Sequence, residues 1–379
     1  MDVSTQRASA TPARSATRDP ANTGVSTIEL FFDLVFVYTV GWLNTVLVDQ
    51  FDLVGLARMT LLLAVLWWMY GGYAWSTNAV PPVRARSQAL LVLGMAGFLV
   101  AALAVPGAFG DSGLAFGLAY LVVTLVHIAL FLANGTTTVW RGLLQLAPWN
   151  LAAALLIVAA ALVDGPLHWV LWVAAPLVLW LHPLVHRAAG FTVAPGHFVE
   201  RHGLVLIIAL GETVIAIGVG ATDLPVDLGL VSVSVLALGV LAALWWFYFT
   251  DNHRFEEGMA RIEPRQRSWA ALTGYGHTFL LLLAGLIVFA AGVKKAVAHP
   301  GEHLYLSAAL AVGGGAALYL LGNLLLRWIL GLRPTVVRVA APLLALATTV
   351  VGAAGSGLAQ LGTLLAVLVA AMLAEVRLR

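Results

Sequence analysis

The stretch from Ile28 to Asp49, which reads IELFFDLVFVYTVGWLNTVLVD, decides the fold. A helix needs about 20 consecutive, mostly apolar residues to cross a bilayer, and this stretch has that length. Its acidic residues are Glu29 and Asp33 near one end and Asp49 at the other. The stretch therefore predicts a membrane-spanning helix that also serves as its own insertion signal.

The rest of the chain repeats this apolar pattern. Of its 379 residues, 61% are hydrophobic and 10% are charged, whereas a soluble domain carries about 25% charged residues. The chain lacks the polar atoms for a water-facing surface, so lipid must be its solvent. We predict an all-α, polytopic membrane protein of about twelve transmembrane helices; the last pair is the weakest, which leaves a count of ten open. The predicted spans are 28–49, 55–77, 88–105, 113–133, 146–163, 167–186, 203–221, 229–250, 269–292, 304–328, 335–352 and 357–375.

The basic residues predict the orientation of these spans. Residues 1–26 are rich in Ser, Thr, Ala and Arg, and we expect a disordered cytoplasmic tail there. With both termini in the cytoplasm, seventeen of the twenty Lys and Arg residues lie in or beside cytoplasmic loops. Only Arg58, Lys294 and Lys295 fall on the other side. Cytoplasmic loops carry an excess of Lys and Arg, so this asymmetry predicts an even number of spans with both ends inside.

Two halves of the chain carry matching features in the same order. The motif WWMY at 67–70 is matched by WWFY at 245–248, and the polar groups that follow them also correspond. We predict two parallel six-helix repeats, 27–190 and 191–379. In transporters with such repeats the substrate site lies between the halves. The segment from Glu29 to Asp33 corresponds to the segment from Glu200 to Gly203. The segment from Tyr120 to Asn134, followed by Arg141, corresponds to the segment from Tyr305 to Asn323, followed by Arg327.

Two motifs have simpler structural explanations. The tryptophans at 67–68 and 245–246 would anchor the spans in an aromatic belt at the membrane interface, which we favour over stacking on a substrate or a lipid. The run Gly313–Gly315 lies within a span and lacks the Lys of a nucleotide-binding loop. It predicts close packing of two helices.

Ionisable side chains inside the bilayer are the candidate functional residues, because inserting each one costs about 2.5–3.5 kcal/mol. Glu29 and Asp33 lie four residues apart on one face of the first span, and Asn44 lies close to the same face. The three would line a path for a cation or a proton. Equally, Asp33 would pair with an Arg of a neighbouring helix and fix the packing.

Glu212 is the strongest single candidate. It lies beside Thr213, midway along an otherwise apolar span, where a carboxylate needs either a proton or a nearby cation. It would act as a proton carrier or as the counter-ion of a buried base, and we favour a functional role over a purely structural one. Gly211 beside it would let another helix approach closely.

A second set of candidates comprises the segment before the seventh span and two histidines. His197, Glu200 and Arg201 would form a polar cluster at the inner mouth of a path. A His and a Glu three residues apart can share a metal-ligand face, but with no second pair we expect a solvated helix start and no metal site. His127 and His277 would relay protons or remain neutral and satisfied by polar neighbours, which we favour.

The sequence offers no catalytic set. The chain has no Cys, which excludes disulfides and thiolate nucleophiles. It also shows no Ser-His-Asp spacing, no phosphate-binding loop and no basic aromatic surface for nucleic acid. We therefore expect no enzymatic activity, no cofactor and no nucleic-acid partner. The lipid bilayer and a small cation or proton are the expected partners, and a homo-oligomer is left open.

Two segments resemble signatures of the bacterial low temperature requirement protein A (LtrA) family. Residues 28–37, IELFFDLVFV, are similar to its opening signature, and residues 197–216, HFVERHGLVLIIALGETVIA, to its second. A Tyr or Phe is more usual at His202 and a Ser at Thr213. The resemblance covers about residues 25–375 and implies a multi-pass protein of the bacterial cytoplasmic membrane, in a family named for growth in the cold. The acidic residues inside the two signatures are Glu29, Asp33, Glu200 and Glu212.

Two functions of different classes fit these features. The first hypothesis is a transporter or channel for a small cation or protons. Its path would run between the two halves, lined by Asp33 and Asn44 of the first span and Glu212 of the seventh. The alternative is a non-transporting membrane protein that binds lipid or a partner, with the intramembrane acids as structural ion pairs.

Overall fold

A computed structural model describes residues 24–134, 137–185, 193–222 and 224–378, and all regular secondary structure in these ranges is helical. The first part contains α1 (Thr27–Asp49), α2 (Leu53–Ala79), α3 (Ala85–Ala104), a short 3₁₀ helix (Val105–Gly107), α4 (Gly113–Asn134), α5 (Thr137–Ala160) and α6 (Pro166–Val185). The second part contains α7 (Pro195–Gly220), α8 (Leu228–Phe249), α9 (Asn252–Arg261), α10 (Pro264–Ala271), a π-helix (Leu272–Thr278), α11 (Phe279–Ala298), α12 (Leu306–Ile329), α13 (Val336–Ala347), α14 (Thr349–Ala354) and α15 (Gly357–Leu378).

Ten helical segments in the described ranges are long and apolar enough to cross a bilayer. The predicted class, an all-α polytopic membrane protein, is confirmed. Each of the twelve predicted spans coincides with a helix, but α5 and α6 are not among the ten. Pro148 lies within α5, whose apolar part, Leu144–Ala160, is short. The weakest predicted pair does qualify, as Val336–Ala354 and Gly357–Leu378.

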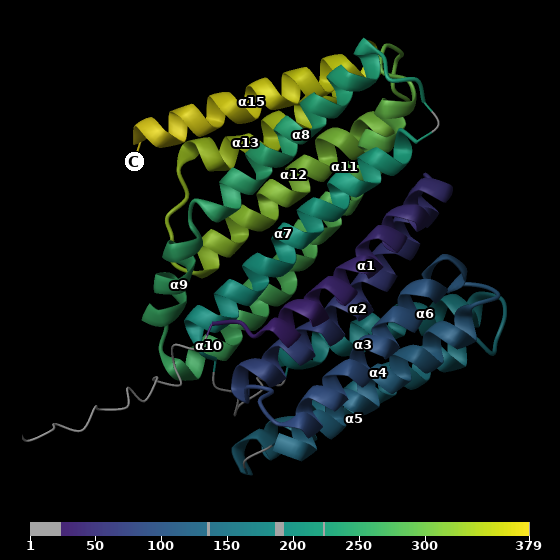
Figure 1. Cartoon of the computed structure of the whole chain (residues 1–379), viewed down its shortest axis with the longest axis vertical. Helices are drawn as coiled ribbons and strands as arrows, with labels where there is room; N and C mark the ends of the chain where they lie inside the picture. The colour runs from purple at the N-terminus through teal and green to yellow at the C-terminus, as the bar shows by residue number, and fades with distance from the viewer. Residues whose placement is uncertain (1–23, 135–136, 186–192, 223, 379) are drawn as a thin grey trace, which may run out of the picture.

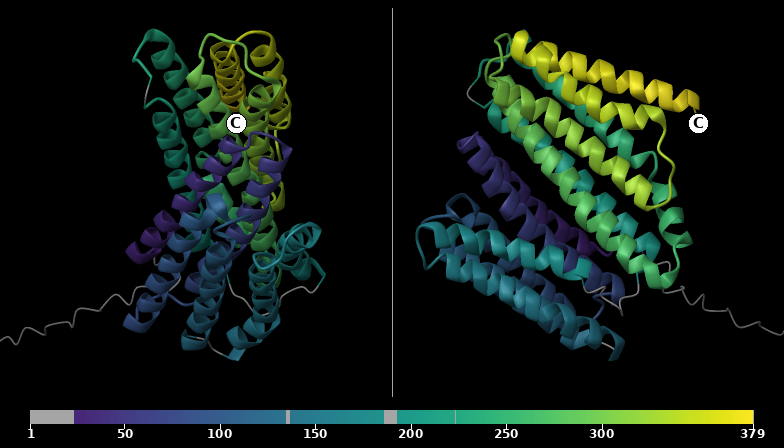
Figure 2. Two further views of the ribbon diagram at one scale, coloured as in Figure 1. Left: turned by 90° about the vertical axis from the view of Figure 1, so that its right-hand side faces the viewer. Right: turned by 180° about the vertical axis from the view of Figure 1, so that it is seen from behind.

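The helices form two groups that meet along α1 and α7 (Figure 1). Helices α2 to α6 lie beside α1, whereas α8 to α15 lie on the α7 side, and Figure 2 shows the same division from two other directions. Helix α1 packs against α2 and α3 of its own group and against α7 and α11 of the other. We call the contact of α1 with α7 and α11 the seam.

Side-chain caps explain where two of the helices begin. Asp52 accepts hydrogen bonds from the backbone N–H groups of Val54 and Gly55 at 2.8 and 2.9 Å, so that it caps α2. The hydrogen bond from Gly55 is the main reason that the pKa of the Asp52 carboxyl lies below its ordinary value, and the bond from Val54 adds to this effect. Asp227 caps α8 in the same way, through the N–H group of Leu230 at 2.8 Å.

The glycine run in α12 lies where helices approach closely, as predicted. A Cβ atom at Gly315 would collide with the backbone of Phe289 in α11, and one at Gly313 would lie 2.7 Å from Thr349 Oγ1 in α14. On α11, a Cβ at Gly285 would lie 2.6 Å from the backbone nitrogen of Tyr319. Only glycine allows backbones to come this near.

The aromatic-belt prediction is wrong for Trp67 and stays a prediction for Trp68, Trp245 and Trp246. Trp245 is 42% exposed on the outer surface of the bundle. Trp67 is 1% exposed and stacks on the rings of Tyr70 and Phe279, with centroids 4.9 and 5.8 Å away. It is therefore a core residue, because α2 is covered on the side where α7 and α11 pack.

Candidate functional site

Charged side chains from α1 and α7 form a buried cluster. Arg201 of α7 donates from Nη1 to Glu29 Oε1 at 3.0 Å and from Nη2 to Asp33 Oδ1 at 3.1 Å. All three side chains are at most 2% exposed. The four-residue spacing thus places both carboxylates on one face of α1, as predicted, and that face is turned toward α7. We call Glu29, Asp33 and Arg201 the charge cluster.

Side chains of α1 and α2 enclose the guanidinium group of Arg201. Tyr70 donates its hydroxyl to Asp33 Oδ1 at 2.9 Å, and Arg201 Nη1 also donates to Thr77 Oγ1. The rings of Phe32 and Tyr70 lie 5.7 Å from the centre of the guanidinium group, within the range of a cation–π contact. Asp33 therefore pairs with an Arg of a neighbouring helix, which is one of the two arrangements that the sequence left open.

His197 extends the charge cluster to the beginning of α7. Its Nε2 lies 3.3 Å from Glu29 Oε2, which also accepts the hydroxyl of Ser26 at 2.7 Å in a capping box. Asn78 Nδ2 lies 3.1 Å from the other ring nitrogen. The expected solvated helix start is therefore wrong for His197, because α1 and α2 cover it.

One oxygen of the charge cluster remains without a partner. Asp33 Oδ2 is buried and has no hydrogen bond within the described part of the chain. One Arg faces two carboxylates, so the three side chains together carry one more negative than positive charge when both carboxylates are ionised. Because a buried charge is costly unless it is paired, this oxygen is the place in the cluster where a proton or a small cation would be most stabilising.

Glu212 of α7 lies in a different environment. Its half-buried side chain faces a cavity of about 170 Å³ between α1, α7 and α11. No salt bridge or hydrogen bond to Glu212 is found among the residues that the structure describes. Asn44 lines the same cavity and donates to the carbonyl oxygen of Ile287 at 3.0 Å. The lining of this Glu212 cavity also includes Tyr38, Gly41, Trp42, Thr45, Ile215, Ala216, Val219 and Lys294.

Gly41 of α1 makes room for the carboxylate of Glu212. A Cβ atom at Gly41 would collide with Glu212 Oε1. The close approach predicted at Gly211 is wrong, because Gly211 is exposed and no heavy atom lies within 4 Å of a Cβ built there. Gly211 faces away from the seam, and the glycine that matters lies on the opposite helix.

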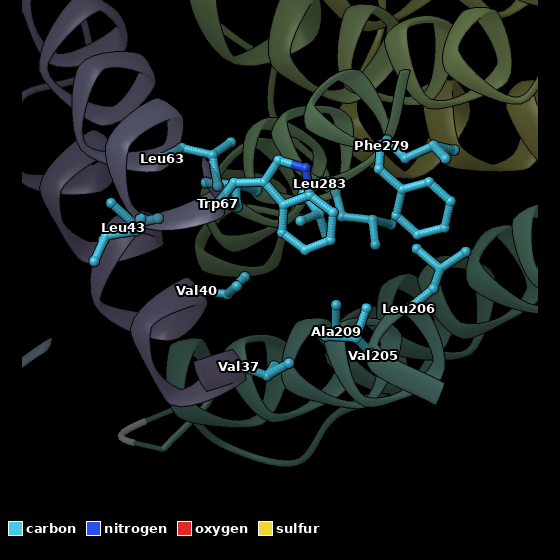
Figure 3. Close-up of a cluster of buried hydrophobic side chains, with 14 of the residues drawn as sticks. Val37, Val40, Leu43, Leu63, Trp67, Val205, Leu206, Ala209, Phe279 and Leu283 are labelled. Atoms are coloured by element: carbon cyan, nitrogen blue, oxygen red, sulfur yellow. The ribbon is translucent and has the colours of Figure 1, made fainter. Parts of the chain in front are cut away.

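Buried apolar side chains of α1, α7 and α11 pack together along the seam, and Figure 3 labels them. They lie between Asp33 and Asn44 on α1 and between Arg201 and Glu212 on α7, with α11 closing the third side. Glu212 follows Arg201 by eleven residues, or about 16 Å at 1.5 Å per residue. We call Val37, Val40, Val205, Leu206, Ala209, Phe279 and Leu283 the hydrophobic layer. Each of these side chains is at most 3% exposed.

Glu200 and Thr213 belong to neither site. Glu200 is exposed in the second turn of α7, and the backbone nitrogen of Val25 lies 3.4 Å from its Oε2. Thr213 is buried, and its hydroxyl donates to the carbonyl oxygen of Ala209 in its own helix at 3.1 Å. Neither side chain lines the Glu212 cavity.

The two intramembrane histidines also lie away from the seam. His127 of α4 packs on Tyr73 of α2, with ring centroids 5.3 Å apart. His277 lies in the π-helix, where its Nδ1 is 3.2 Å from the carbonyl oxygen of Leu272 and its ring meets Trp180 edge-on. Neither histidine lines the Glu212 cavity, so the structure does not join them to Asp33 and Glu212.

A second buried ionic network was not singled out from the sequence. Arg327 of α12 pairs with Asp251, which follows α8. Arg338 of α13 lies 2.8 Å from the same carboxylate and 3.1 Å from Glu375 Oε1 of α15. These side chains are at most 3% exposed. Glu375, an acid within an apolar span, was the signal that could have revealed this network.

The described residues contain no group of three or more His, Asp or Glu side chains that could hold a metal ion. His197 and Glu200 have the spacing of a shared ligand face, but His197 contacts Glu29 whereas Glu200 is exposed. What these sites offer chemically is buried carboxylates: Glu29 and Asp33 are bound by Arg201, and Glu212 faces a cavity.

The fold and these sites define a polytopic helical membrane protein with ionisable groups buried between its helices. The sequence profile described as "Bacterial low temperature requirement A protein (LtrA)" matches residues 24–374. A protein of Rhizobium meliloti (strain 1021) described as "Uncharacterized protein RA0937" is 30% identical over 313 residues, 78% of this chain and 75% of the relative. The chain belongs to the LtrA family, as its two signatures predicted.

Proposed function

We propose that this bacterial membrane protein moves a small cation or protons along the seam between α1 and α7. The observation that carries the proposal is Glu212, a half-buried carboxylate inside a membrane-spanning helix that faces a cavity and has no ion-pair partner in the described chain. An ionisable side chain within the bilayer is costly, and such residues commonly mark ion paths and proton relays.

The layers along the seam correspond to a closed path. A cation or proton would enter the Glu212 cavity and meet Glu212 and Asn44. The hydrophobic layer would then block its passage, since apolar constrictions gate by excluding water. Beyond that layer, the unpartnered Oδ2 of Asp33 supplies a second position for a positive charge. Opening would require α1 and α7 to move apart at the hydrophobic layer and Arg201 to loosen its hold on Asp33.

An internal repeat would explain why the path lies at this seam. We infer twelve spans in two parallel halves, 27–190 and 191–379, with both termini in the cytoplasm. Helices α1 and α7 are then equivalent, since each opens one half. Matching contacts support this arrangement: the Tyr120 hydroxyl of α4 donates to a carbonyl of α2, and the Tyr319 hydroxyl of α12 to a carbonyl of α8, both at 3.1 Å. Functional sites between such halves are common in transporters.

The charge cluster favours a second candidate function, a non-transporting membrane protein that binds lipid or a partner. Arg201 is bound by two carboxylates and enclosed by aromatic rings. The network around Asp251 and Arg338 has the same enclosed character. In this alternative, Glu29 and Asp33 only hold α1 against α7, and Glu212 carries no ion.

Flux measurements distinguish the two candidates. The purified chain would be reconstituted in liposomes, and proton, potassium and sodium fluxes recorded for the wild type, Glu212→Gln and Glu302→Gln. Glu302 is exposed in the loop before α12 and serves as the matched control. We expect flux in the wild type and in Glu302→Gln, and none in Glu212→Gln although that variant stays folded. No flux of any of these ions, together with a lower unfolding temperature for Glu212→Gln, would establish the alternative.

A further inference from the structure

A second, larger cavity lies among α2, α4, α5, α6, α7 and the segment formed by α10 and the π-helix. Its volume is about 430 Å³, within the range of about 300–1,000 Å³ typical of small-molecule sites. Five tryptophans line it: Trp67, Trp68, Trp75, Trp180 and Trp269. We call it the aromatic cavity. It shares no lining residue with the Glu212 cavity.

The tryptophan walls are held in place by hydrogen bonds of their indole groups. Three of the five donate Nε1–H to fixed acceptors in neighbouring helices, which holds their rings in place before an occupant arrives. Rings fixed before binding lose little conformational entropy when a ligand arrives. The pairs are Trp67 with the carbonyl oxygen of Gly276 at 3.0 Å, Trp68 with Asn150 Oδ1 at 2.9 Å, and Trp180 with the carbonyl oxygen of Ala64 at 3.1 Å.

The charge at the edge of this cavity is positive. Arg265 and Gln266, both exposed in the first turn of α10, belong to the lining. No Asp or Glu is among the described lining residues. Arg265 can hold a carboxylate through charge-assisted hydrogen bonds, and no acidic side chain of the described lining would repel that carboxylate.

Helix α10 is anchored so that Arg265 stays at the edge of the cavity. The guanidinium group of Arg267 donates to the carbonyl oxygens of Met259 and Ile262 at 3.2 Å each. Helices α9 and α10 lie at the end of the bundle where α7 begins, as Figure 1 shows. We expect that end to lie near the membrane–water boundary, where the head groups of amphiphiles lie, because the apolar span of α7 begins there.

The inner wall of the cavity carries an unused polar group. Tyr275 of the π-helix lines the cavity and is 1% exposed. Its hydroxyl has no hydrogen-bond partner in the described ranges. Single π-helical turns are rare and frequently occur at functional sites. This one presents both Tyr275 and the carbonyl group that fixes Trp67.

We propose that the aromatic cavity binds a single-chain anionic amphiphile of the fatty-acid class. The chain packs between the tryptophan rings, and the carboxylate lies beside Arg265 at the membrane boundary. This site is separate from the seam and does not depend on ion movement along it.

Glycine positions supply a variant that fills the cavity without disturbing the fold. Gly71 of α2 lines the cavity, and no heavy atom lies within 4 Å of a Cβ built there. Leucine at this position would therefore occupy the space of the ligand. Gly218 of α7 is exposed, and a Cβ built there also meets no heavy atom within 4 Å, but Gly218 does not line the aromatic cavity. Gly71→Leu and Gly218→Leu thus form a matched pair.

The test measures the binding of brominated laurate to the full chain in nanodiscs. Quenching of tryptophan fluorescence by the bromine atoms reports the binding. Unlabelled laurate, dodecanol and dodecyltrimethylammonium compete for the site. We expect saturable quenching that Gly71→Leu weakens about tenfold, Arg265→Gln weakens about threefold, and Gly218→Leu leaves unchanged. Laurate should compete best. Equal quenching in Gly71→Leu and the wild type would show adsorption to the lipid-facing surface and overturn the proposal, as would competition by dodecanol or dodecyltrimethylammonium equal to that of laurate.

Discussion

Helices α1 and α7 hold carboxylates in two opposite environments. At one end of the seam, Glu29 and Asp33 are bound by Arg201 and enclosed by protein. Toward the other end, Glu212 faces an open cavity and has no ion pair in the described chain. Residue type and depth alone therefore do not show which intramembrane acid is free to exchange a proton or a cation. The difference is the presence or absence of an Arg on the facing helix.

This contrast separates residues that hold the helices together from residues that would act. Removing one partner of a buried ion pair leaves an uncompensated charge and destabilises the fold strongly. Removing an unpaired carboxylate leaves no such charge. Stability and flux should therefore respond to different substitutions along one seam.

The largest expected effect is on stability at the charge cluster. Arg201→Met leaves two buried carboxylates without their cation, and we expect it to lower the free energy of unfolding by about 3–5 kcal/mol. Arg261, which is exposed in α9 and pairs with Glu257, is the control, and Arg261→Met should cost less than about 1 kcal/mol. Thermal unfolding in detergent measures both. Equal unfolding temperatures for the two variants would mean that the cluster does not hold the helices together.

The second effect is on the Glu212 cavity. Gly41→Leu would displace the carboxylate of Glu212 and fill part of the cavity, so flux should fall to background. Overpacking of this kind costs about 1–3 kcal/mol, which leaves a folded protein. The control is Gly314→Ala in α12, where a Cβ would make only an ordinary contact with Leu346 at 3.8 Å. Wild-type flux in Gly41→Leu would place the path elsewhere.

A smaller effect is expected at the hydrophobic layer. Val40→Thr keeps the shape of the side chain but replaces a methyl group by a hydroxyl group, which should ease wetting of the constriction and raise the flux. Burying the hydroxyl would cost about 1–3 kcal/mol. Val240→Thr, at a fully buried position of α8, is the matched control and should leave flux unchanged. An equal increase in both variants would indicate general loosening of the fold.

The smallest effect is expected at Glu200, which carries the same charge outside both sites. Glu200→Gln should change the free energy of unfolding by less than about 0.5 kcal/mol and leave the flux at the wild-type level. The side chain is exposed and its nearest donor, the backbone nitrogen of Val25, lies 3.4 Å away. Loss of flux in this variant would mean that the path includes the exposed surface at the beginning of α7, and would contradict its restriction to the seam.

Hydropathy and helical spacing predicted the fold and part of the site. Uninterrupted apolar length identifies each span, because lipid imposes it. The four-residue spacing of Glu29 and Asp33 predicted their shared face, and the depth of Glu212 marked it as a candidate. These are properties of one helix at a time.

The remaining features depend on how helices pack, which a single sequence does not reveal. Nothing local shows that Arg201 reaches across to Asp33, or that Gly41 and not Gly211 accommodates Glu212. The interpretation of Trp67 as a membrane anchor was wrong for the same reason, since its burial comes from α7 and α11. Each of these contacts joins segments far apart in the chain.

The most direct test of the central claim uses the absence of Cys from the chain, because one introduced thiol is then the only one. Thr45 lines the Glu212 cavity, whereas Leu206 is fully buried in the hydrophobic layer. A charged, membrane-impermeant thiol reagent would be applied to Thr45→Cys and Leu206→Cys in liposomes while flux is recorded. We predict that Thr45→Cys reacts and its flux stops, while Leu206→Cys remains unmodified. An unreactive Thr45→Cys, or a modified one with undiminished flux, would contradict the account.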